Sequence, residues 1–138
     1  MSTFVDTNIL VYAHDVDAGR RHDVAAGLLR QLWDARDGVV STQVLQEFYV
    51  SITRKIPKAI SRKDARELIR TYTAWRVIGI EPADVVAASE HEERYRLSFW
   101  DALILTSALK ANADRLVSED LQAGQRIRGL HITNPFEE

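Results

Sequence analysis

The sequence predicts an α/β protein with a parallel β-sheet and helices on both faces of that sheet. Short runs rich in β-forming residues alternate with longer segments whose apolar residues recur at helical spacing, and this alternation is typical of parallel α/β folds. The chain has 138 residues and shows no internal repeat, low-complexity tract or flexible linker. We therefore expect a single domain spanning residues 1–138.

The first half of the chain shows the alternation clearly. Residues 3–6 predict the first strand and residues 8–14 a short helix. Residues 22–36 predict a longer helix, because apolar side chains recur every three or four positions. Its apolar stripe consists of Ala25, Leu28, Leu29, Leu32 and Trp33. Residues 38–41 then predict a second strand, and residues 42–55 a helix with an apolar stripe at Val44, Leu45, Phe48 and Ile52.

The second half continues the pattern. A helix is expected at residues 61–75, whose apolar stripe includes Leu68 and Tyr72. The remaining expected elements are a strand at 77–80, helices at 83–97 and 99–112, and strands at 115–118 and 131–133. Proline and glycine mark the loops between elements. Because ligands of such sheets bind beyond the carboxyl ends of the strands, functional residues should follow strands directly.

Composition excludes several classes of protein. The chain has no cysteine, so it has neither a disulfide framework nor a thiolate metal site. Its formal net charge of −2 does not favour holding nucleic acid by bulk attraction. No segment has the pattern of a signal peptide, and no apolar run approaches the roughly 20 residues of a membrane span. We expect a cytoplasmic protein without membrane association.

Two aspartates stand at positions where chemistry is expected. Asp6 ends the first predicted strand, in the segment FVDTN; its alternative role is to cap the helix that follows. Asp101 lies in the segment SFWDALI, where Ser98 and Asp101 have the spacing of a capping box. The helix after Asp101 is almost wholly apolar for two turns, so its amino terminus should be buried. Its dipole should then stabilise an ionised Asp101.

Two further acids have weaker signals. Glu47 lies on the apolar side of the helix expected at 42–55, where an acid needs a partner; an exposed position at the edge of the stripe is the alternative. Asp120 follows the strand expected at 115–118, and its alternative role is that of a turn or N-cap residue. Glu119 stands beside it, so the sequence leaves open which of the two belongs to a site.

These four acids are expected to converge. Three of them follow strands and the fourth lies early on a helix that does, and in a parallel sheet such positions meet at one edge. Carboxylates within about 4–6 Å repel one another, so a cluster persists only if protons are shared or a cation is bound. An all-oxygen site suits Mg²⁺ or Mn²⁺. The sequence has no His-x-x-x-His pair, glycine-rich phosphate loop or Gly-x-Ser-x-Gly turn that would indicate other chemistry.

The segments that carry the acids resemble the motifs of PIN domains, especially the VapC toxins of bacterial toxin–antitoxin pairs. The segment FVDTNILVYA resembles the opening of these proteins, and STQVLQE, WDAL and LVSED resemble their later motifs in the same order. The acids are also spaced as in the family, by 41, 54 and 19 residues. The resemblance covers nearly the whole chain and is most specific in the first and third segments.

The resemblance implies a three-layer α/β/α sandwich with a central parallel sheet, RNA cleavage dependent on Mg²⁺ or Mn²⁺, a homodimer and a cognate antitoxin protein. It also implies a set of catalytic, metal-binding acids, namely Asp6, Glu47, Asp101 and Asp120. Thr7 and Ser118 would support these acids with their hydroxyls, and Asn8 would be a nearby polar helper. The family often has threonine at the position of Ser118, and serine keeps the hydroxyl.

The resulting hypothesis is that a metal-activated water attacks an RNA phosphate in line. Arg94 and Arg96 would hold flanking phosphates; solvated charge at a helix end is the alternative. The segment 42–75 contains two amphipathic helices, explained either by core packing or by a groove for an antitoxin. A non-catalytic PIN-fold nucleic-acid-binding or protein-interaction module is the main alternative function. A phosphatase-like hydrolase is a third, although Asn8 stands where it would need a second aspartate.

Overall fold

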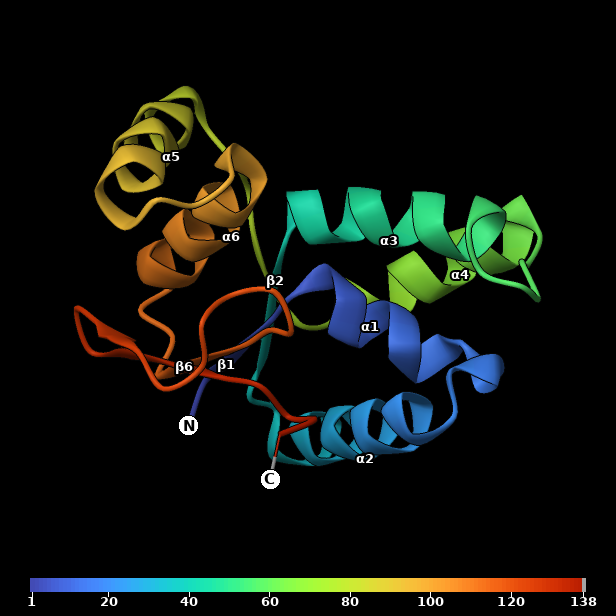
Figure 1. Ribbon diagram of the computed structural model, residues 1–138. Helices are drawn as coiled ribbons and strands as arrows, with labels where there is room; N and C mark the ends of the chain where they lie inside the picture. Colours follow the sequence, from blue (N-terminus) through green and yellow to red (C-terminus); the bar gives the residue numbers. More distant parts are fainter. Residues whose placement is uncertain (138) are drawn as a thin grey trace.

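The computed structural model describes residues 1–137 and contains a six-stranded sheet flanked by helices (Figure 1). From one edge to the other, the strands are β3 (Arg76–Ile78), β2 (Gly38–Ser41), β1 (Thr3–Val5), β4 (Arg115–Val117), β6 (Leu130–Thr133) and β5 (Arg126–Ile127). All neighbouring pairs are parallel except β5 with β6.

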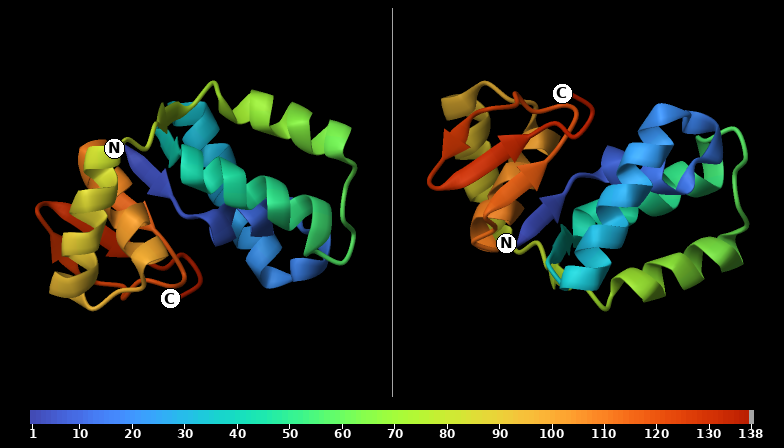
Figure 2. Two further views of the ribbon diagram at one scale, coloured as in Figure 1. Left: turned by 90° about the horizontal axis from the view of Figure 1, so that it is seen from above. Right: turned by 90° about the horizontal axis from the view of Figure 1, so that it is seen from below.

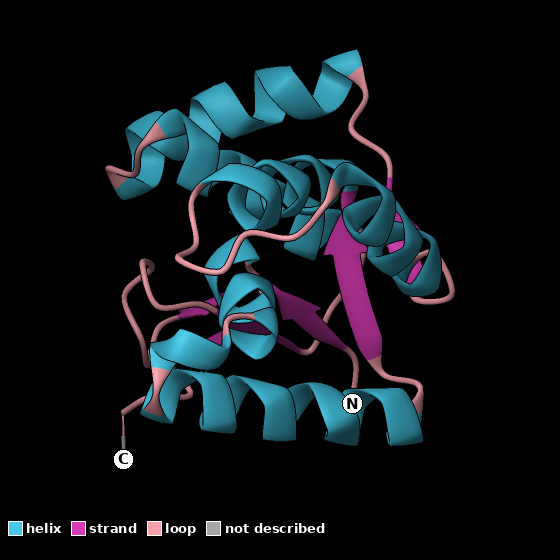
Figure 3. Cartoon of the chain, turned by 90° about the vertical axis from the view of Figure 1, so that its right-hand side faces the viewer, coloured by secondary structure: helices cyan, strands magenta, loops and turns pink. Residues whose placement is uncertain are grey.

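Within the described residues, six α-helices and one short 3₁₀ helix cover this sheet. They are α1 (Thr7–His14), η1 (Val16–Ala18), α2 (Arg20–Ala35), α3 (Thr42–Arg54), α4 (Arg62–Tyr72), α5 (Pro82–Tyr95) and α6 (Phe99–Lys110). Helix α1 contacts α2 and α3, α3 contacts α4, and α5 contacts α6. Figure 2 shows α5 and α6 on one side of the chain and α1 to α4 on the other, as expected for an α/β/α sandwich. Figure 3 looks onto α1 to α4.

The strand order explains this division of the helices. From β1 to β2 to β3 the sheet grows in one direction, and then the chain returns to place β4 on the other side of β1. Because parallel crossovers are right-handed, this reversal moves the connecting helices to the opposite face. The direction changes between β1 and β4, and such a switch point is where parallel α/β sheets form ligand sites.

The edge of the sheet differs from the sequence prediction, which placed only a loop there and described the whole sheet as parallel. Strand β5 pairs antiparallel with β6, as Arg126 with His131 and Ile127 with Leu130. The two residues between these strands, Arg128 and Gly129, both have positive φ, 50° and 85°, as a tight two-residue hairpin turn requires. A two-residue strand is too short to show periodicity, which is why the prediction missed it.

The core lies between the sheet and both groups of helices. Its fully buried side chains include Phe4, Ile9, Leu10, Phe48, Leu105, Leu116 and Ile132. Within the described part of the chain, no helix combines the length and apolar character needed to cross a membrane.

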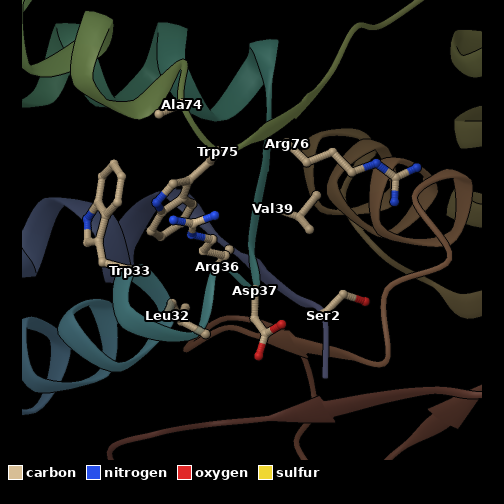
Figure 4. Close-up of a pocket in the computed structure, with 10 residues that line it drawn as sticks. Ser2, Leu32, Trp33, Arg36, Asp37, Val39, Ala74, Trp75 and Arg76 are labelled. Carbon is tan, nitrogen blue, oxygen red and sulfur yellow. The ribbon is translucent and has the colours of Figure 1, made fainter.

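The aromatic side chains of Trp33, Tyr72 and Trp75 pack together at the amino-terminal end of the sheet. The ring centroid of Trp75 lies 5.3 Å from that of Trp33 and 5.2 Å from that of Tyr72. Figure 4 shows both tryptophans in the wall of a cavity at this end, near Asp37. The Trp75 ring covers Gly38 so closely that a Cβ on Gly38 would lie 2.5 Å from ring atoms. Glycine is therefore required at the start of β2, because a larger residue would collide with the Trp75 ring.

We expect the Gly38→Ala substitution to lower the free energy of unfolding by about 1–3 kcal/mol, because the added methyl overpacks the Trp75 ring. Gly27→Ala is the matched control, since a Cβ on Gly27 meets no atom within 4 Å. Gly27 lies inside α2, where alanine should instead stabilise the helix by about 1 kcal/mol. Urea denaturation of the two variants measures both effects, and equal stability of Gly38→Ala and wild type would contradict this account.

Candidate active site

Asp6 is fixed between β1, α1 and β4. It follows the last residue of β1 and caps α1, with one carboxylate oxygen accepting a hydrogen bond from the Thr7 backbone N–H at 2.7 Å. Its other oxygen accepts from the Ser118 hydroxyl at 2.8 Å, and its own N–H donates to the Val117 carbonyl at 3.0 Å. The capping role and the expected site position therefore coincide in one residue, because capping uses only one of the two oxygens.

Burial makes the charge of Asp6 costly. The residue is only 4% exposed, and burial raises its pKa to about 7. The hydrogen bonds from Ser118 and Thr7 lower the pKa, whereas the nearby carboxylates of Asp120 and Asp101 raise it. A cation beside Asp6 would remove this cost by favouring the ionised form.

Asp101 is half-buried in the first turn of α6. The Ser98 hydroxyl caps this helix by accepting from the Asp101 backbone N–H at 3.1 Å. Only this half of the expected capping box forms, since the Asp101 carboxylate accepts no hydrogen bond from any residue in the described range. The carboxylate instead lines the same pocket as Asp6.

Residues in the first turn of α1 hydrogen-bond to the other two acids, Glu47 and Asp120. The Thr7 hydroxyl donates to the Glu47 carboxylate at 2.6 Å, and the Asn8 amide donates to the Asp120 carboxylate at 2.9 Å. The Ser118 hydroxyl also accepts from the Asp120 backbone N–H at 3.1 Å. Thr7 therefore joins α1 to α3, and Asn8 joins α1 to the loop after β4.

The structure shows which of the two neighbouring acids, Glu119 or Asp120, lines the pocket. The sequence left this choice open. Glu119 accepts from the Tyr12 hydroxyl at 2.7 Å and from the Arg21 side chain at 2.6 Å. Asp120 lines the pocket with the other acids. Partial burial raises the pKa of Asp120, and the charges of Asp101, Glu119 and Glu47 raise it further. Asp120 is therefore the fourth acid of the pocket, and Glu119 belongs to a salt bridge beside it.

The four acids share a pocket of about 390 Å³ at the carboxyl ends of β1 and β4. Sequence reasoning missed several of its residues, namely Gln43, Gln46, Val50, Ser51, Lys55, Trp100 and Ile104. Helical periodicity around Glu47 could have found Gln43, Val50 and Ser51, because they lie one turn before or after it on α3. Arg94 and Arg96 do not line this pocket; Arg94 lines a separate one with His91 and Arg128.

The donor set of the pocket fits a hard divalent cation. It offers carboxylate, hydroxyl and amide oxygens and contains no histidine, which suits Mg²⁺ or Mn²⁺. Among residues 1–137, no three acidic or histidine side chains lie close enough to hold one ion together. The acids thus face a common space rather than forming a closed cluster, in keeping with their mutual repulsion.

The pKa of Asp6 predicts how stability depends on pH. In metal-free buffer we expect the free energy of unfolding to fall as pH rises from about 4 to 7. In this range the folded chain keeps a proton on Asp6 that the unfolded chain, with the ordinary pKa of 3.8, releases. One pKa unit corresponds to about 1.4 kcal/mol, so the fall is up to about 4 kcal/mol.

Urea denaturation at pH 5 and pH 8 measures this effect. The Asp6→Asn variant lacks this titrating group and should show a clearly smaller fall, leaving only the contribution of the raised pKa of Asp120. Added Mg²⁺ should restore stability of the wild type at pH 8, because it binds only the folded chain. If wild type and Asp6→Asn had the same pH dependence, burial of the Asp6 charge would not carry the cost described here.

Known proteins show the same architecture. The family model described as PIN domain matches residues 3–126, whereas no curated protein matches the chain significantly. A toxin–antitoxin complex from Klebsiella pneumoniae is 23% identical, with a TM-score of 0.68 over 99% of this chain and 100% of that one. The toxin VapC20 of Mycobacterium tuberculosis, which cleaves the sarcin–ricin loop, is 24% identical, with a TM-score of 0.65 over 83% and 87%.

A third similar structure is VapBC2 from Rickettsia felis, bound to a DNA fragment from its promoter. It is 21% identical, with a TM-score of 0.65 over 97% of this chain and 98% of that one. These likenesses establish the fold, and the family model covers most of the chain, including all four acids of the pocket. The chain belongs to the PIN domain family.

Proposed function

We propose that this chain is a metal-dependent endoribonuclease of the cytoplasm and the toxin of a toxin–antitoxin pair. The observation that carries the proposal is the buried Asp6 carboxylate, held between β1 and β4 and facing Asp101 and Asp120 across one pocket. A protein gains no stability from such an arrangement unless a cation binds there. Family membership and the fold of known VapC toxins support the same reading.

Each residue has a role in this proposal. Asp6 and Asp101 would be the main ligands of Mg²⁺ or Mn²⁺, while Glu47 and Asp120 would complete the site or orient the attacking water. When bound, the ion supplies Lewis acidity toward a phosphate and acidifies water. The chain itself supplies positioning: Ser118, Thr7 and Asn8 fix the carboxylates of Asp6, Glu47 and Asp120 by hydrogen bonds.

Nuclease assays on single-stranded RNA with Mn²⁺ or Mg²⁺ test the proposal. We expect Asp6→Asn and Asp101→Asn each to reduce cleavage by at least about 100-fold, because a catalytic metal contributes several kcal/mol to transition-state stabilisation. Asp120→Asn should also reduce cleavage. Glu119→Gln is its matched control and should retain activity, since Glu119 is paired with Tyr12 and Arg21.

Undiminished cleavage by both Asp6→Asn and Asp101→Asn would overturn the catalytic assignment. RNA binding by the folded wild type without cleavage in either metal would instead favour a non-catalytic nucleic-acid-binding module. One observation favours that alternative, namely that no three ligands are already in place among the described residues.

An apolar cavity of about 500 Å³ between α3 and α4 supports the antitoxin part of the proposal. It is lined by Thr42, Leu45, Gln46, Tyr49, Val50 and Ile69. Gln46 and Val50 also line the carboxylate pocket, so a peptide seated on α3 would lie beside the acids and obstruct them. An amphipathic helix fits such a groove. A homodimer, implied by the family resemblance, stays a prediction.

A small protein encoded next to this gene is the expected antitoxin. Co-expressed with the wild type, it should co-purify with the chain and suppress cleavage. We expect Tyr49→Asp to lower its affinity at least about tenfold, because a charge would be buried in an apolar contact. Titration by calorimetry measures the affinity, and Lys63→Asp, outside the cavity, is the control. Equal affinity of wild type and Tyr49→Asp would place the partner elsewhere.

A further inference from the structure

A pocket of about 210 Å³ lies between α5 and the turn of the β5–β6 hairpin, and we call it the hairpin pocket. Its lining consists of Ala87, Glu90, His91, Arg94 and Arg128, none of which lines the carboxylate pocket. Figure 2 shows α5 and the hairpin on the same side of the chain. The volume is below the roughly 300–1,000 Å³ of pockets for drug-sized ligands, so the hairpin pocket suits a smaller group.

His91 is the buried polar residue of the hairpin pocket. It is 7% exposed, and its Nδ1 atom lies 2.9 Å from the Thr106 hydroxyl oxygen. That hydroxyl donates its own proton to the Ala102 carbonyl at 2.7 Å, so it accepts from His91 and Nδ1 carries a proton. The Nε2 atom forms no hydrogen bond with a residue of the described range and is not enclosed. Nε2 is therefore the free polar atom that His91 offers to the pocket.

Two exposed arginines line the same pocket as His91. Arg94 lies on α5, one helical turn after the histidine, and Arg128 lies in the hairpin turn with a φ of 50°. Among the described residues, neither guanidinium forms an ion pair or a hydrogen bond. The Arg94 guanidinium carbon lies 5.6 Å from the centroid of the Tyr95 ring, a contact that leaves its N–H groups available. The sequence analysis gave Arg94 a phosphate at the acidic site, and the structure places it here instead.

The groups that face His91 carry more positive than negative charge. Burial lowers the pKa of His91, the charges of Arg128 and Arg94 also lower it, and the charge of Glu90 raises it. The Tyr95 ring centroid lies 5.9 Å from that of the imidazole, and α6 contributes the threonine hydroxyl, which has no charge. Two arginines against one glutamate leave the pocket with a positive balance. An anion between the arginines would offset their charge and would favour the protonated imidazole.

We infer that the hairpin pocket binds a phosphate group, either as free phosphate or as the terminal phosphate of a nucleotide. Arg94 and Arg128 would bind its oxygens, because a guanidinium fork matches the geometry of a phosphate. The protonated imidazole of His91 would donate from Nε2 to a further oxygen. A phosphate offers an oxygen to each of these three groups, whereas a carboxylate has only two. The inference does not depend on the proposed nuclease function, since the two pockets share no lining residue.

Titration followed by NMR tests the inference on the full chain without added metal. Sodium phosphate is added to the ¹⁵N-labelled protein, and sodium chloride at equal ionic strength is the reference. We expect saturable shifts of the backbone amides around residues 87–94 and 126–130. Arg94→Ala and Arg128→Ala should each weaken the affinity about tenfold, because each removes a charge-assisted hydrogen bond. Arg96→Ala and Arg126→Ala are the matched controls: they remove one exposed positive charge outside the pocket lining and should bind like the wild type.

Sulfate tests the histidine separately, because the charge of this tetrahedral anion stays constant near neutral pH. We expect its affinity to fall about fivefold or more between about pH 5.5 and about pH 8, since only the protonated imidazole donates from Nε2. His91→Gln should lose most of this pH dependence. Arg94 and Arg128 are exposed, so their variants test the site even where His91→Gln fails to fold.

Adenosine monophosphate and adenosine distinguish the two sources of the phosphate. Equal affinity for the monophosphate and for free phosphate, with no binding of adenosine, would identify the phosphate group as all that is recognised. Tighter binding of the monophosphate would identify a nucleotide as the ligand. The inference is overturned if phosphate causes no saturable shifts beyond those of chloride, or if Arg96→Ala weakens binding as much as Arg94→Ala does. Asp6→Asn should bind phosphate like the wild type, so a failed nuclease assay leaves this result unchanged.

Discussion

The organisation of this molecule depends on one buried carboxylate, which hydrogen bonds hold in place but which has no cationic side chain as a partner within the described residues. Asp6 is 4% exposed and receives hydrogen bonds from the Thr7 N–H and the Ser118 hydroxyl, yet no cationic side chain pairs with it in the described chain. These two donors favour the charge, but burial opposes it more strongly and raises the pKa of Asp6 to about 7. Such a group is kept at a cost in stability, which is typical of a functional position.

The first turn of α1 connects Asp6 to the rest of the site through hydrogen bonds. Three consecutive residues connect to three different elements: Asp6 to Ser118 after β4, Thr7 to Glu47 on α3, and Asn8 to Asp120. Because the turn follows β1 directly at the point where the sheet changes its direction of growth, all three partners can reach it. The spacing of the acids along the sequence is therefore a consequence of the topology.

Helix α3 contributes residues to two neighbouring surfaces, the carboxylate pocket and the apolar cavity. Gln43 and Glu47 lie on the carboxylate pocket, Leu45 and Tyr49 lie on the apolar cavity against α4, and Gln46 with Val50 borders both. A ligand on one surface would therefore touch the border of the other without any change in the fold. The cavity at the opposite end of the sheet, with Trp33 and Trp75 in its wall, is of similar size but contains a single acid, Asp37. Volume alone thus does not identify the site.

The sequence by itself predicted the six α-helices and five of the six strands, because periodic apolar patterns are local features. It also named Asp6, Glu47 and Asp101, and it named Asp120 as the fourth acid without excluding Glu119. It missed β5, which has too few residues for a pattern, and it placed Arg94 and Arg96 near the site. Only the tertiary structure decided that Asp120 rather than Glu119 lines the pocket, and that Lys55 and Trp100 line it as well. Those choices depend on which side chains find partners across the sheet, and such long-range contacts leave no periodic signal in the chain.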